Sequence, residues 1–390
     1  MKLDPWKHKE KYLEWKEKVK DKGISKISKE NSDLTLQYVF DMEEGINIAL
    51  GSVKGSRGYG RLLSLKNRLI WFSNKFKEFY NINRVTDIKE DQLISFFSNL
   101  KRGIIKRKDG RDFKSPETYA KIFKAFWHWW MKVNKRKGID ITDITLDLDT
   151  RQEKPDWVYL TEEQVRKLCD NAKFEYKVLI MFLFDTGIRA PTELLNIKVS
   201  DFFNDFKELN IRDEISKTFG RRIKLLICPA LIKQYVKEKE LKPDDFLFKF
   251  CPHAVNQYLQ RLAKRVLGDG VSEAGQKYSE ITMYDFRHNS CCYWLPRYKS
   301  ESALKYRFGW KSTEKIHYYS ELLGMKDTIS EEDLLMDVTK TELEKRIEQA
   351  EKKSKILEET NEQLKLKIAE IEQLTNMIHR QMRVNQGLEL

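Results

Sequence analysis

The sequence lacks a long apolar run, a secretion signal and an abundance of residues that break secondary structure. Its longest fully apolar stretch, Val178 to Phe184, is far shorter than the roughly 20 residues of a membrane-spanning helix. The lysine-rich first 22 residues contain no apolar signal core. With 8 prolines, 17 glycines and 41% hydrophobic residues in 390, the chain is neither collagen-like nor disordered throughout. We expect two or three domains with packed cores and no membrane segment.

Cysteine is also scarce. The 5 cysteines are odd in number and scattered, and none belongs to a C-x-x-C pair, which favours free thiols in a reducing compartment. One alternative is a zinc site built from Cys251, His253, His288 and Cys291. Because this spacing fits no common zinc-ligand pattern, we expect mostly buried thiols and no metal site.

Positive charge, in contrast, is in excess. Lysine and arginine number 73 against 60 aspartates and glutamates, which gives a formal net charge of +13 and a pI near 9.2. A basic balance of this size favours an anionic partner, with nucleic acid first and a membrane surface second.

The first part of the chain is charged and then helical in pattern. Residues 1–32 form a lysine-rich leader with interleaved aromatics, which fits either a helix lying on DNA or a solvated arm. Residues 33–147 have the apolar spacing of a helical domain. Ser115 as N-cap and Pro116 in the first turn predict the start of its last helix. We interpret the aromatics from Phe126 to Trp130 as core packing. A basic cluster between two expected helices is a candidate DNA-contacting surface, with a solvated turn as the alternative. It comprises Lys101, Arg102, Lys106, Arg107, Lys108 and Arg111.

A polar, proline-bearing stretch at residues 148–158 predicts an interdomain linker before a mixed domain at residues 159–325. Thr161 to Gln164 fits a capping box that opens a helix, and a later helix is expected at Pro191–Ile197. A β-like section from Glu208 to Ile227, with Glu214-Ile215 among its strand residues, turns at Thr218 to Gly220. The predicted fold class is therefore mainly α with a small antiparallel β-sheet (α+β).

Residues 338–384 have a different composition, with no glycine or proline and a seven-residue apolar repeat. A sustained two-position seam of this kind predicts a coiled coil, and Asn361 within it favours two strands. The alternative is a single helix packed on its own chain. The seam positions are Ile347, Ser354, Asn361, Ile368, Thr375 and Met382, with Leu343, Ala350, Leu357, Leu364, Ile371 and Ile378.

Three separated stretches carry the residues with the clearest chemistry. In the first, from Asp185 to Leu195, an apolar helix ends at Thr-Gly, and Arg189 follows two residues after this glycine. In the second, Ser216-Lys217-Thr218-Phe219-Gly220, a lysine lies at the tip of the expected hairpin. The third combines Tyr284-Asp285-Phe286-Arg287-His288, Phe308-Gly309-Trp310-Lys311-Ser312 and Tyr318-Tyr319.

In these stretches the chain resembles the tyrosine recombinase (phage integrase) family. The Thr-Gly-Ile-Arg sequence ending at Arg189 is similar to the first arginine box of the family, and Lys217 to its catalytic lysine. The box that contains Arg287 is similar to His-Asp-Leu-Arg-His, and Gly309-Trp310 precedes Tyr319 at the spacing of the family. All elements occur in family order. The resemblance covers roughly residues 32–323 and excludes the coiled coil.

The resemblance implies an enzyme that cuts and rejoins DNA through a 3′-phosphotyrosyl intermediate, without a metal, ATP or other cofactor. Arg189 and Arg287 would bind the non-bridging phosphate oxygens. Lys217 would protonate the leaving 5′ oxygen, and Tyr319 would be the nucleophile. Trp310 would pack against the site and donate its indole N–H.

The sequence also departs from the family pattern. Tyr284 replaces the usual histidine, and because a phenol is a poor base near neutral pH, we expect Tyr284 to position the phosphate. His288 is then a structural neighbour of the second arginine rather than a substitute. Glu193 lies one residue later than the usual acid, which leaves its buttressing role open. Tyr318 adjoins Tyr319, but adjacent helical residues point ~100° apart, and the spacing favours Tyr319.

The primary functional hypothesis is a site-specific recombinase or integrase acting on double-stranded DNA. It would act in the cytoplasm of a host cell as a tetramer at synapsis, with an added coiled-coil dimer contact. The composition, rich in lysine and isoleucine, suggests an archaeal virus or another mobile element. The alternatives are a non-catalytic DNA-binding or architectural protein of the same fold, and a relaxing enzyme similar to type IB topoisomerases.

Overall fold

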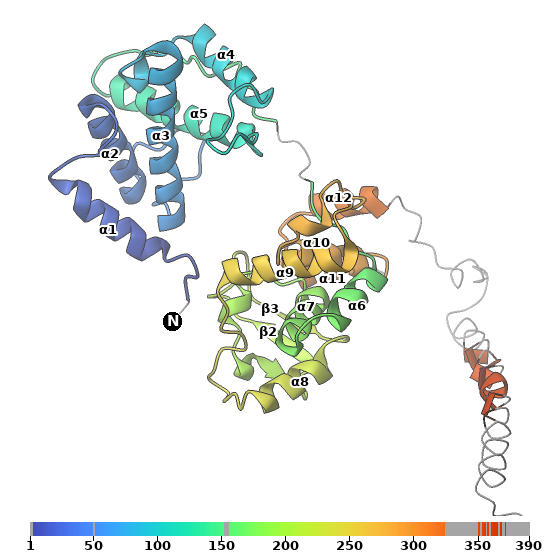
Figure 1. The fold of residues 1–390 in the computed structure, drawn as a ribbon. Helices are drawn as coiled ribbons and strands as arrows, with labels where there is room; N and C mark the ends of the chain where they lie inside the picture. Colours follow the sequence, from blue (N-terminus) through green and yellow to red (C-terminus); the bar gives the residue numbers. More distant parts are fainter. Residues whose placement is uncertain are drawn as a thin grey trace, which may run out of the picture. The chain divides into compact units, whose positions relative to one another are not determined.

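The computed structural model describes residues 3–49, 51–151, 156–298 and 300–323, together with helical positions between 350 and 371. These residues are mainly helical and include a small antiparallel sheet, so the predicted fold class is confirmed (Figure 1). The chain divides into two compact units, Met1–Tyr293 with Ser300–Thr313, and Trp294–Lys299 with Glu314–Leu390. In the described part of the chain, no helix is sufficiently long and apolar to cross a membrane.

The first unit begins with a helical region that has its own hydrophobic core. Its centre is aromatic: the rings of Phe72, Phe76, Phe96 and Phe123 are fully buried and meet mainly edge to face, the geometry that aromatic quadrupoles favour. The expected core role of the run from Phe126 to Trp130 is confirmed for its buried members. The helices are α1 (His8–Lys20), α2 (Lys29–Glu44), α3 (Tyr59–Tyr80), η1 (Val85–Asp87), α4 (Glu90–Lys101) and α5 (Pro116–Lys135).

Two local expectations for this region need correction. The lysine-rich leader contains α1, and Tyr12 on this helix is fully buried in the core, so a wholly solvated arm, one of the two alternatives, does not form. The Tyr12 hydroxyl donates a hydrogen bond to Oε2 of Glu43 at 2.8 Å, which fixes α1 to α2. Pro116 opens α5 as expected, but the Ser115 side chain makes no capping bond.

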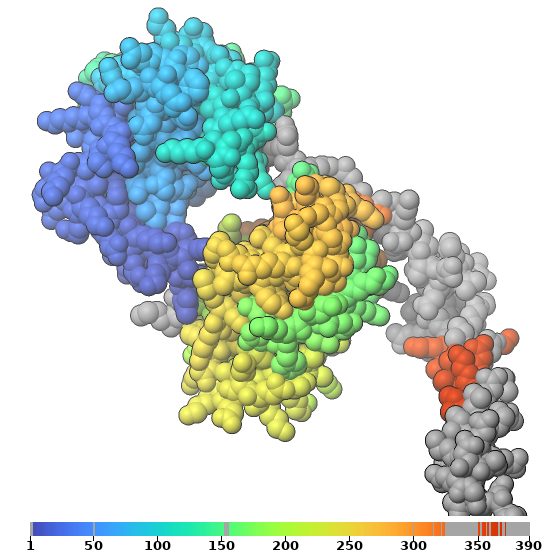
Figure 2. Space-filling view, viewed as in Figure 1, coloured from blue at the N-terminus to red at the C-terminus, as the bar shows by residue number. Residues whose placement is uncertain are grey.

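The mixed region has a second core, separate from the first. The apolar run that opens at Val178 forms most of α7 (Phe174–Thr186), which is buried on nearly all sides. The predicted capping box opens α6 (Glu162–Asp170): Thr161 Oγ1 accepts from the Gln164 N–H, and the Gln164 side chain accepts from the Thr161 N–H. Helix α6 packs against α9 (Pro252–Leu267), and the space-filling view shows their residues in green and yellow at the surface (Figure 2).

The sheet is antiparallel with strand order β1-β2-β3. Its strands are β1 (Phe202–Phe203), β2 (Glu208–Ile211) and β3 (Arg221–Lys224), and Ile211 pairs with Arg221. The remaining elements of the region are η2 (Leu194–Asn196), η3 (Val199–Asp201), α8 (Pro229–Glu238), η4 (Tyr278–Glu280), α10 (Asp285–Trp294) and α11 (Glu301–Phe308).

The β section is shorter than the sequence predicts. Glu214-Ile215 forms a turn within the loop at residues 212–220. Strand β2 ends at Ile211 because the next side chain, Arg212, binds outside the sheet: its Nε lies 2.9 Å from Oδ1 of Asp201, and its Nη2 donates to the Asn196 carbonyl at 2.7 Å. Strand β3 ends before Ile227, since Oδ2 of Asp185 accepts the N–H groups of residues 226–228. These donors are therefore unavailable to a ladder.

The expected helix at Pro191–Ile197 is also wrong. The segment contains only the short 3₁₀ helix η2. The Glu193 side chain folds back to the main-chain N–H of Arg189 at 3.1 Å, and Ile197 already accepts a hydrogen bond from Leu247 at 2.8 Å. The segment is therefore not an α-helix, because these two hydrogen bonds hold Glu193 against Arg189 and Ile197 beside Leu247.

The second unit contributes α12 (Glu314–Leu323) and the helical positions between 350 and 371. The expected coiled coil at residues 338–384 lies largely outside the described residues. Four described large apolar seam residues are exposed, namely Leu357, Leu364, Ile368 and Ile371 at 56%, 51%, 55% and 62%.

Candidate active site

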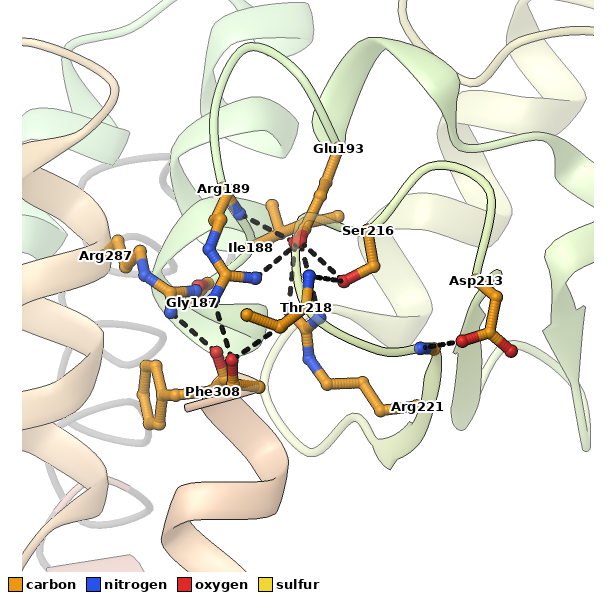
Figure 3. A network of polar contacts seen from close by, with 12 residues as sticks. Gly187, Ile188, Arg189, Glu193, Asp213, Ser216, Thr218, Arg221, Arg287 and Phe308 are labelled. Atoms are coloured by element: carbon orange, nitrogen blue, oxygen red, sulfur yellow. Dashed lines mark hydrogen bonds and ion pairs between the residues drawn. The ribbon is translucent and has the colours of Figure 1, made fainter. Parts of the chain in front are cut away.

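The two arginines singled out from the sequence meet at the ends of two helices. Arg287, on α10, donates from Nη1 to the carbonyl of Gly187 and from Nη2 to that of Phe308 at 2.6 Å. Arg189 donates from Nη2 to the carbonyl of Gly309 at 2.7 Å. Consecutive carbonyls at the end of α11 therefore hold the two guanidinium groups together (Figure 3).

Glycine is required where α7 and α11 end. Gly187 and Gly309 have φ values of +57° and +60°, in the left-handed region that other residues adopt at a cost. A Cβ on Gly187 would lie 2.2 Å from the ring of Phe308, and one on Gly309 would lie 2.9 Å from Nη1 of Arg221. The chain can approach this closely because neither residue has a side chain.

Glu193 is the buried acid of the site. Its Oε1 is 2.7 Å from Nη1 of Arg189, and its Oε2 is 2.9 Å from Nη2 of Arg221. Burial alone would raise the pKa of Glu193, but Arg221 and then Arg189 lower it to about 2. The carboxylate is thus ionised and buttresses Arg189, despite its late position in the sequence.

Arg221 was missed by sequence reasoning, although the register of β3 carries a signal. Along this strand Arg221 and Ile223 are buried, whereas Arg222 and Lys224 are exposed. Arginine therefore occupies a position where strand alternation places a core residue. Such a position needs a buried partner, which here is Glu193.

A second buried ion pair supports the first. Nη2 of Arg307 lies 2.9 Å from Oδ1 of Asp185, and the carbonyl of Arg307 accepts a hydrogen bond from Nε of Arg221 at 2.8 Å. Asp185 and Arg307 were not assigned roles from the sequence. They tie the end of α7 to α11 and β3, and so hold the segment before Arg189 beside the strand that carries Arg221 and the helix that carries the Phe308 carbonyl.

The six charged side chains of this network carry unequal charge. Four arginines, at positions 189, 221, 287 and 307, face two carboxylates, at 185 and 193, which leaves a surplus of two positive charges. Burial, and then the neighbouring Arg189, lower the pKa of Arg287 to about 10. An anion bound here would relieve this repulsion, so the network has the electrostatics of an anion site.

Three further predicted residues lie in the same unit. Lys217 is exposed in the loop between β2 and β3. The Trp310 ring stacks on Phe308 with centroids 4.9 Å apart, and the Arg287 guanidinium is 5.9 Å from its centroid. Tyr284, 47% exposed, precedes α10 and meets the ring of His288 at 5.2 Å.

The structure places Tyr319 on α12, in the second unit. Its side chain is 4% exposed, and its ring centroid is 5.1 Å from that of Tyr318. The nucleophilic role of Tyr319, like the roles of the other site residues, remains a prediction from the sequence.

The basic cluster flanks and occupies the loop between α4 and α5, and much of it is paired with acids. Lys101 binds Asp149, Lys106 lies 3.9 Å from Asp112, and Asp109 contacts two arginines, Arg107 at 3.1 Å and Arg111 at 3.6 Å. Lys108 and Arg102 are exposed. The cluster therefore keeps less positive charge than its sequence suggests, and its contact with DNA stays a prediction.

Two residues of the alternative zinc site differ in their exposure. Cys251 is exposed beside the first turn of α9, whereas Cys291 is buried within α10. In the parts of the chain that the structure covers, no cluster of three or more histidine, cysteine, aspartate or glutamate side chains could hold a metal ion.

Comparisons with known proteins give a family match for part of the chain and similar folds. Residues 158–324 match the model of the phage integrase family. No curated protein matches the chain. Among solved structures, the Tn1549 transposon integrase with a circular intermediate DNA is similar at a TM-score of 0.53 and 14% identity, covering 75% of this chain and 95% of that one.

Two other solved structures are similar. The XerH site-specific recombinase in a post-cleavage complex has a TM-score of 0.50 and 18% identity, covering 68% of this chain and 77% of that one. A lambda integrase tetramer bound to a Holliday junction has a TM-score of 0.52 and 15% identity, with coverage of 83% and 82%. Residues 158–324 thus match the phage integrase family, and the chain has the fold of the tyrosine recombinases.

Proposed function

We propose that this protein is a site-specific recombinase or integrase that cuts and rejoins double-stranded DNA through a 3′-phosphotyrosyl intermediate, without metal, ATP or other cofactor. The observation that carries the proposal is the meeting of Arg189 and Arg287 on the consecutive carbonyls of Phe308 and Gly309. This arrangement, with its surplus positive charge, suits a phosphodiester whose negative charge grows in the transition state.

The guanidinium groups retain donors for such a phosphate. Each arginine has five N–H donors, and the side-chain bonds described above use two on Arg189 and two on Arg287. The remaining donors would bind the non-bridging oxygens, since a planar guanidinium matches two phosphate oxygens at once. Tyr284 would donate a further hydrogen bond to the phosphate, and Trp310 would pack against the site and donate through its indole N–H.

The chemical step uses the tyrosine and the lysine. The Tyr319 oxygen forms a bond to phosphorus while the bond from phosphorus to the 5′ oxygen breaks. Lys217 gives its proton to the departing 5′ oxygen, and the phenol proton leaves to solvent. The phosphotyrosyl bond keeps the phosphodiester energy, so a second 5′ hydroxyl can reverse the step and rejoin the strands without ATP.

Covalent trapping of DNA tests the proposal. A duplex nicked beside the cleavage position loses a short leaving strand, so the protein should remain attached to DNA on a denaturing gel. The adduct should vanish in Tyr319→Phe with DNA binding retained, and persist in the matched control Tyr318→Phe. Loss of the adduct in Tyr318→Phe alone would show that Tyr318, and not Tyr319, is the nucleophile.

A non-catalytic DNA-binding or architectural protein of the same fold is the second candidate. The observation in its favour is Tyr284, which stands where the family most often has histidine. If no adduct forms under any condition while binding is specific, this second function is the correct one.

We further propose that four copies assemble on two DNA sites, with a coiled-coil dimer contact from the C-terminal helix. The lambda integrase tetramer on a Holliday junction supports such an assembly. The exposed seam residues Leu357, Leu364 and Ile368 support a partner helix. Lys353 precedes one seam position and Glu358 follows the next, so in a parallel pair they would face each other across the seam.

Deletion of residues 339–390 tests the coiled coil. The truncated chain should still form the covalent adduct on a nicked duplex, but should pair two DNA sites less well. Recombination by the truncated chain at the full-length rate would contradict the dimer contact.

A further inference from the structure

The loop between β2 and β3 is held to the arginine site on both sides of Lys217. Before the lysine, Ser216 Oγ donates a hydrogen bond to Oε1 of Glu193 at 3.2 Å. After it, Thr218 Oγ1 donates to the carbonyl of Gly309 at 2.8 Å. Figure 3 shows both contacts beside Arg189.

These two acceptors are the ones that also hold Arg189. Glu193 Oε1 accepts from Nη1 of Arg189 at 2.7 Å, and the carbonyl of Gly309 accepts from its Nη2 at 2.7 Å. One carboxylate and one carbonyl thus position both the arginine and the lysine loop. Any shift of Arg189 relative to this loop would stretch hydrogen bonds at a shared acceptor.

Hydrogen bonds inside the loop also join the two residues that hold it, Ser216 and Thr218. Thr218 N–H donates to Ser216 Oγ at 3.3 Å, directly across Lys217. At the base of the loop, Gly220 N–H donates to Oδ1 of Asp213 at 2.6 Å. The main chain around Lys217 is therefore fixed, whereas its side chain is exposed and can reach outward.

We propose that Ser216 and Thr218 are positioning residues that set the place of the Lys217 ammonium relative to the phosphate held by Arg189. This inference rests on the proposed function. Proton transfer to a departing oxygen depends on hydrogen-bond geometry, and a misplacement of about 1 Å can cost about 100-fold in rate. The two hydroxyl groups touch neither phosphate nor leaving group, and they act through the lysine.

The experiment compares two DNA substrates that differ in one atom. In the ordinary substrate the departing 5′ oxygen needs a proton. In a substrate with sulfur at the bridging 5′ position, the departing thiolate needs none, so the acid becomes dispensable. Single-turnover cleavage is measured for wild type, Lys217→Met, Ser216→Ala with Thr218→Val, Thr218→Ser and the same-loop control Glu214→Gln.

We expect Lys217→Met to lose about 10²- to 10⁴-fold on the oxygen substrate, and the double variant to lose about 10- to 100-fold. Both losses should disappear on the sulfur substrate. Thr218→Ser keeps its hydroxyl and should cleave both substrates as wild type does, as should Glu214→Gln. Hydrogen exchange of residues 212–220 should be faster in the double variant than in wild type.

Three results would overturn the inference while leaving strand cleavage intact. The double variant could cleave the oxygen substrate at the wild-type rate. Its defect could persist on the sulfur substrate, as expected for an Arg189→Lys variant, which would mean that Ser216 and Thr218 serve the arginine. Lys217→Met could show no defect. If wild type itself forms no adduct with either substrate, the proposed function fails and this inference fails with it.

Discussion

Oε2 of Glu193 and Nη2 of Arg221 lie 2.9 Å apart, and neither side chain is exposed to solvent. The carboxylate also binds Arg189, so one acid, just before the 3₁₀ helix η2, joins a strand residue to a residue that follows a helix. Breaking a buried pair by removing one partner is costly, because the other charge stays buried and uncompensated. The integrity of the arginine site should therefore depend on this carboxylate.

Glu193→Gln should lower the free energy of unfolding by about 3–5 kcal/mol. The amide is nearly the same size but leaves two arginines without their anion. Denaturant unfolding followed by circular dichroism measures the loss. The control is Glu214→Gln, whose carboxylate is half exposed and bound to Arg212, where ~0–1 kcal/mol is expected. Equal effects in both variants would contradict the role of burial.

The same carboxylate predicts a pH dependence of stability. The pKa of Glu193 falls from 4.5 to about 2 on folding, so its ionisation stabilises the folded state fully above pH 4.5. As the pH falls from 4.5 towards 2 this contribution is lost, because the unfolded state binds the proton first. Wild type should lose more stability over this interval than Glu193→Gln. Parallel curves would show that folding does not lower the pKa of Glu193.

Gly187→Ala should destabilise the protein and abolish adduct formation. The new Cβ would meet the Phe308 ring at 2.2 Å, and Phe308 carries a carbonyl that binds Arg287. Gly110→Ala is the matched control, with φ +78° but nothing within 4 Å of the added Cβ. It should show only the backbone cost of about 1–2 kcal/mol. Thermal melting of both variants separates the steric clash from the backbone term.

Inorganic phosphate should stabilise the folded protein through Arg287. The surplus of positive charge in the network gives the anion a site in the folded state alone, and such binding raises the melting temperature. The shift should exceed that produced by chloride at equal ionic strength. It should vanish in Arg287→Gln but remain in the control Arg222→Gln, which changes an exposed arginine on β3. A shift that survives Arg287→Gln would locate the anion elsewhere.

Tyr284→His should introduce a new pH dependence into cleavage. The side chain is 47% exposed, so the replacement should be tolerated. A phenol donates a hydrogen bond throughout the neutral range, whereas an imidazole changes its charge near pH 6.5. Single-turnover rates between pH 5 and 8 should therefore follow an imidazole titration only in the variant. A wild-type profile with the same inflection would assign it to another group.

Sequence periodicity predicted the helices well where burial and caps agree. Helix α6 begins where the capping box from Thr161 to Gln164 predicted, since the two residues cap each other and one face is buried. Arg189 and Arg287 stood out because of local sequence context. Arg221, Asp185 and Arg307 did not, because their meaning comes from partners between 28 and 122 residues away, which no local pattern encodes. The helix expected after Pro191 is absent for a related reason, since Ile197 pairs with Leu247, which is distant in the sequence.

The carbonyl groups of Phe308 and Gly309 belong to adjacent residues. The length of a single peptide unit, about 3.8 Å from one Cα to the next, therefore sets the distance between the two guanidinium groups. Both acceptors are electrically neutral. A phosphate entering the site would therefore meet Arg287 with its full charge and would have no rival anion to displace from that residue. Inserting or deleting one residue near the end of α11 would change the spacing of these two carbonyl groups, and with it the spacing of the two guanidinium groups.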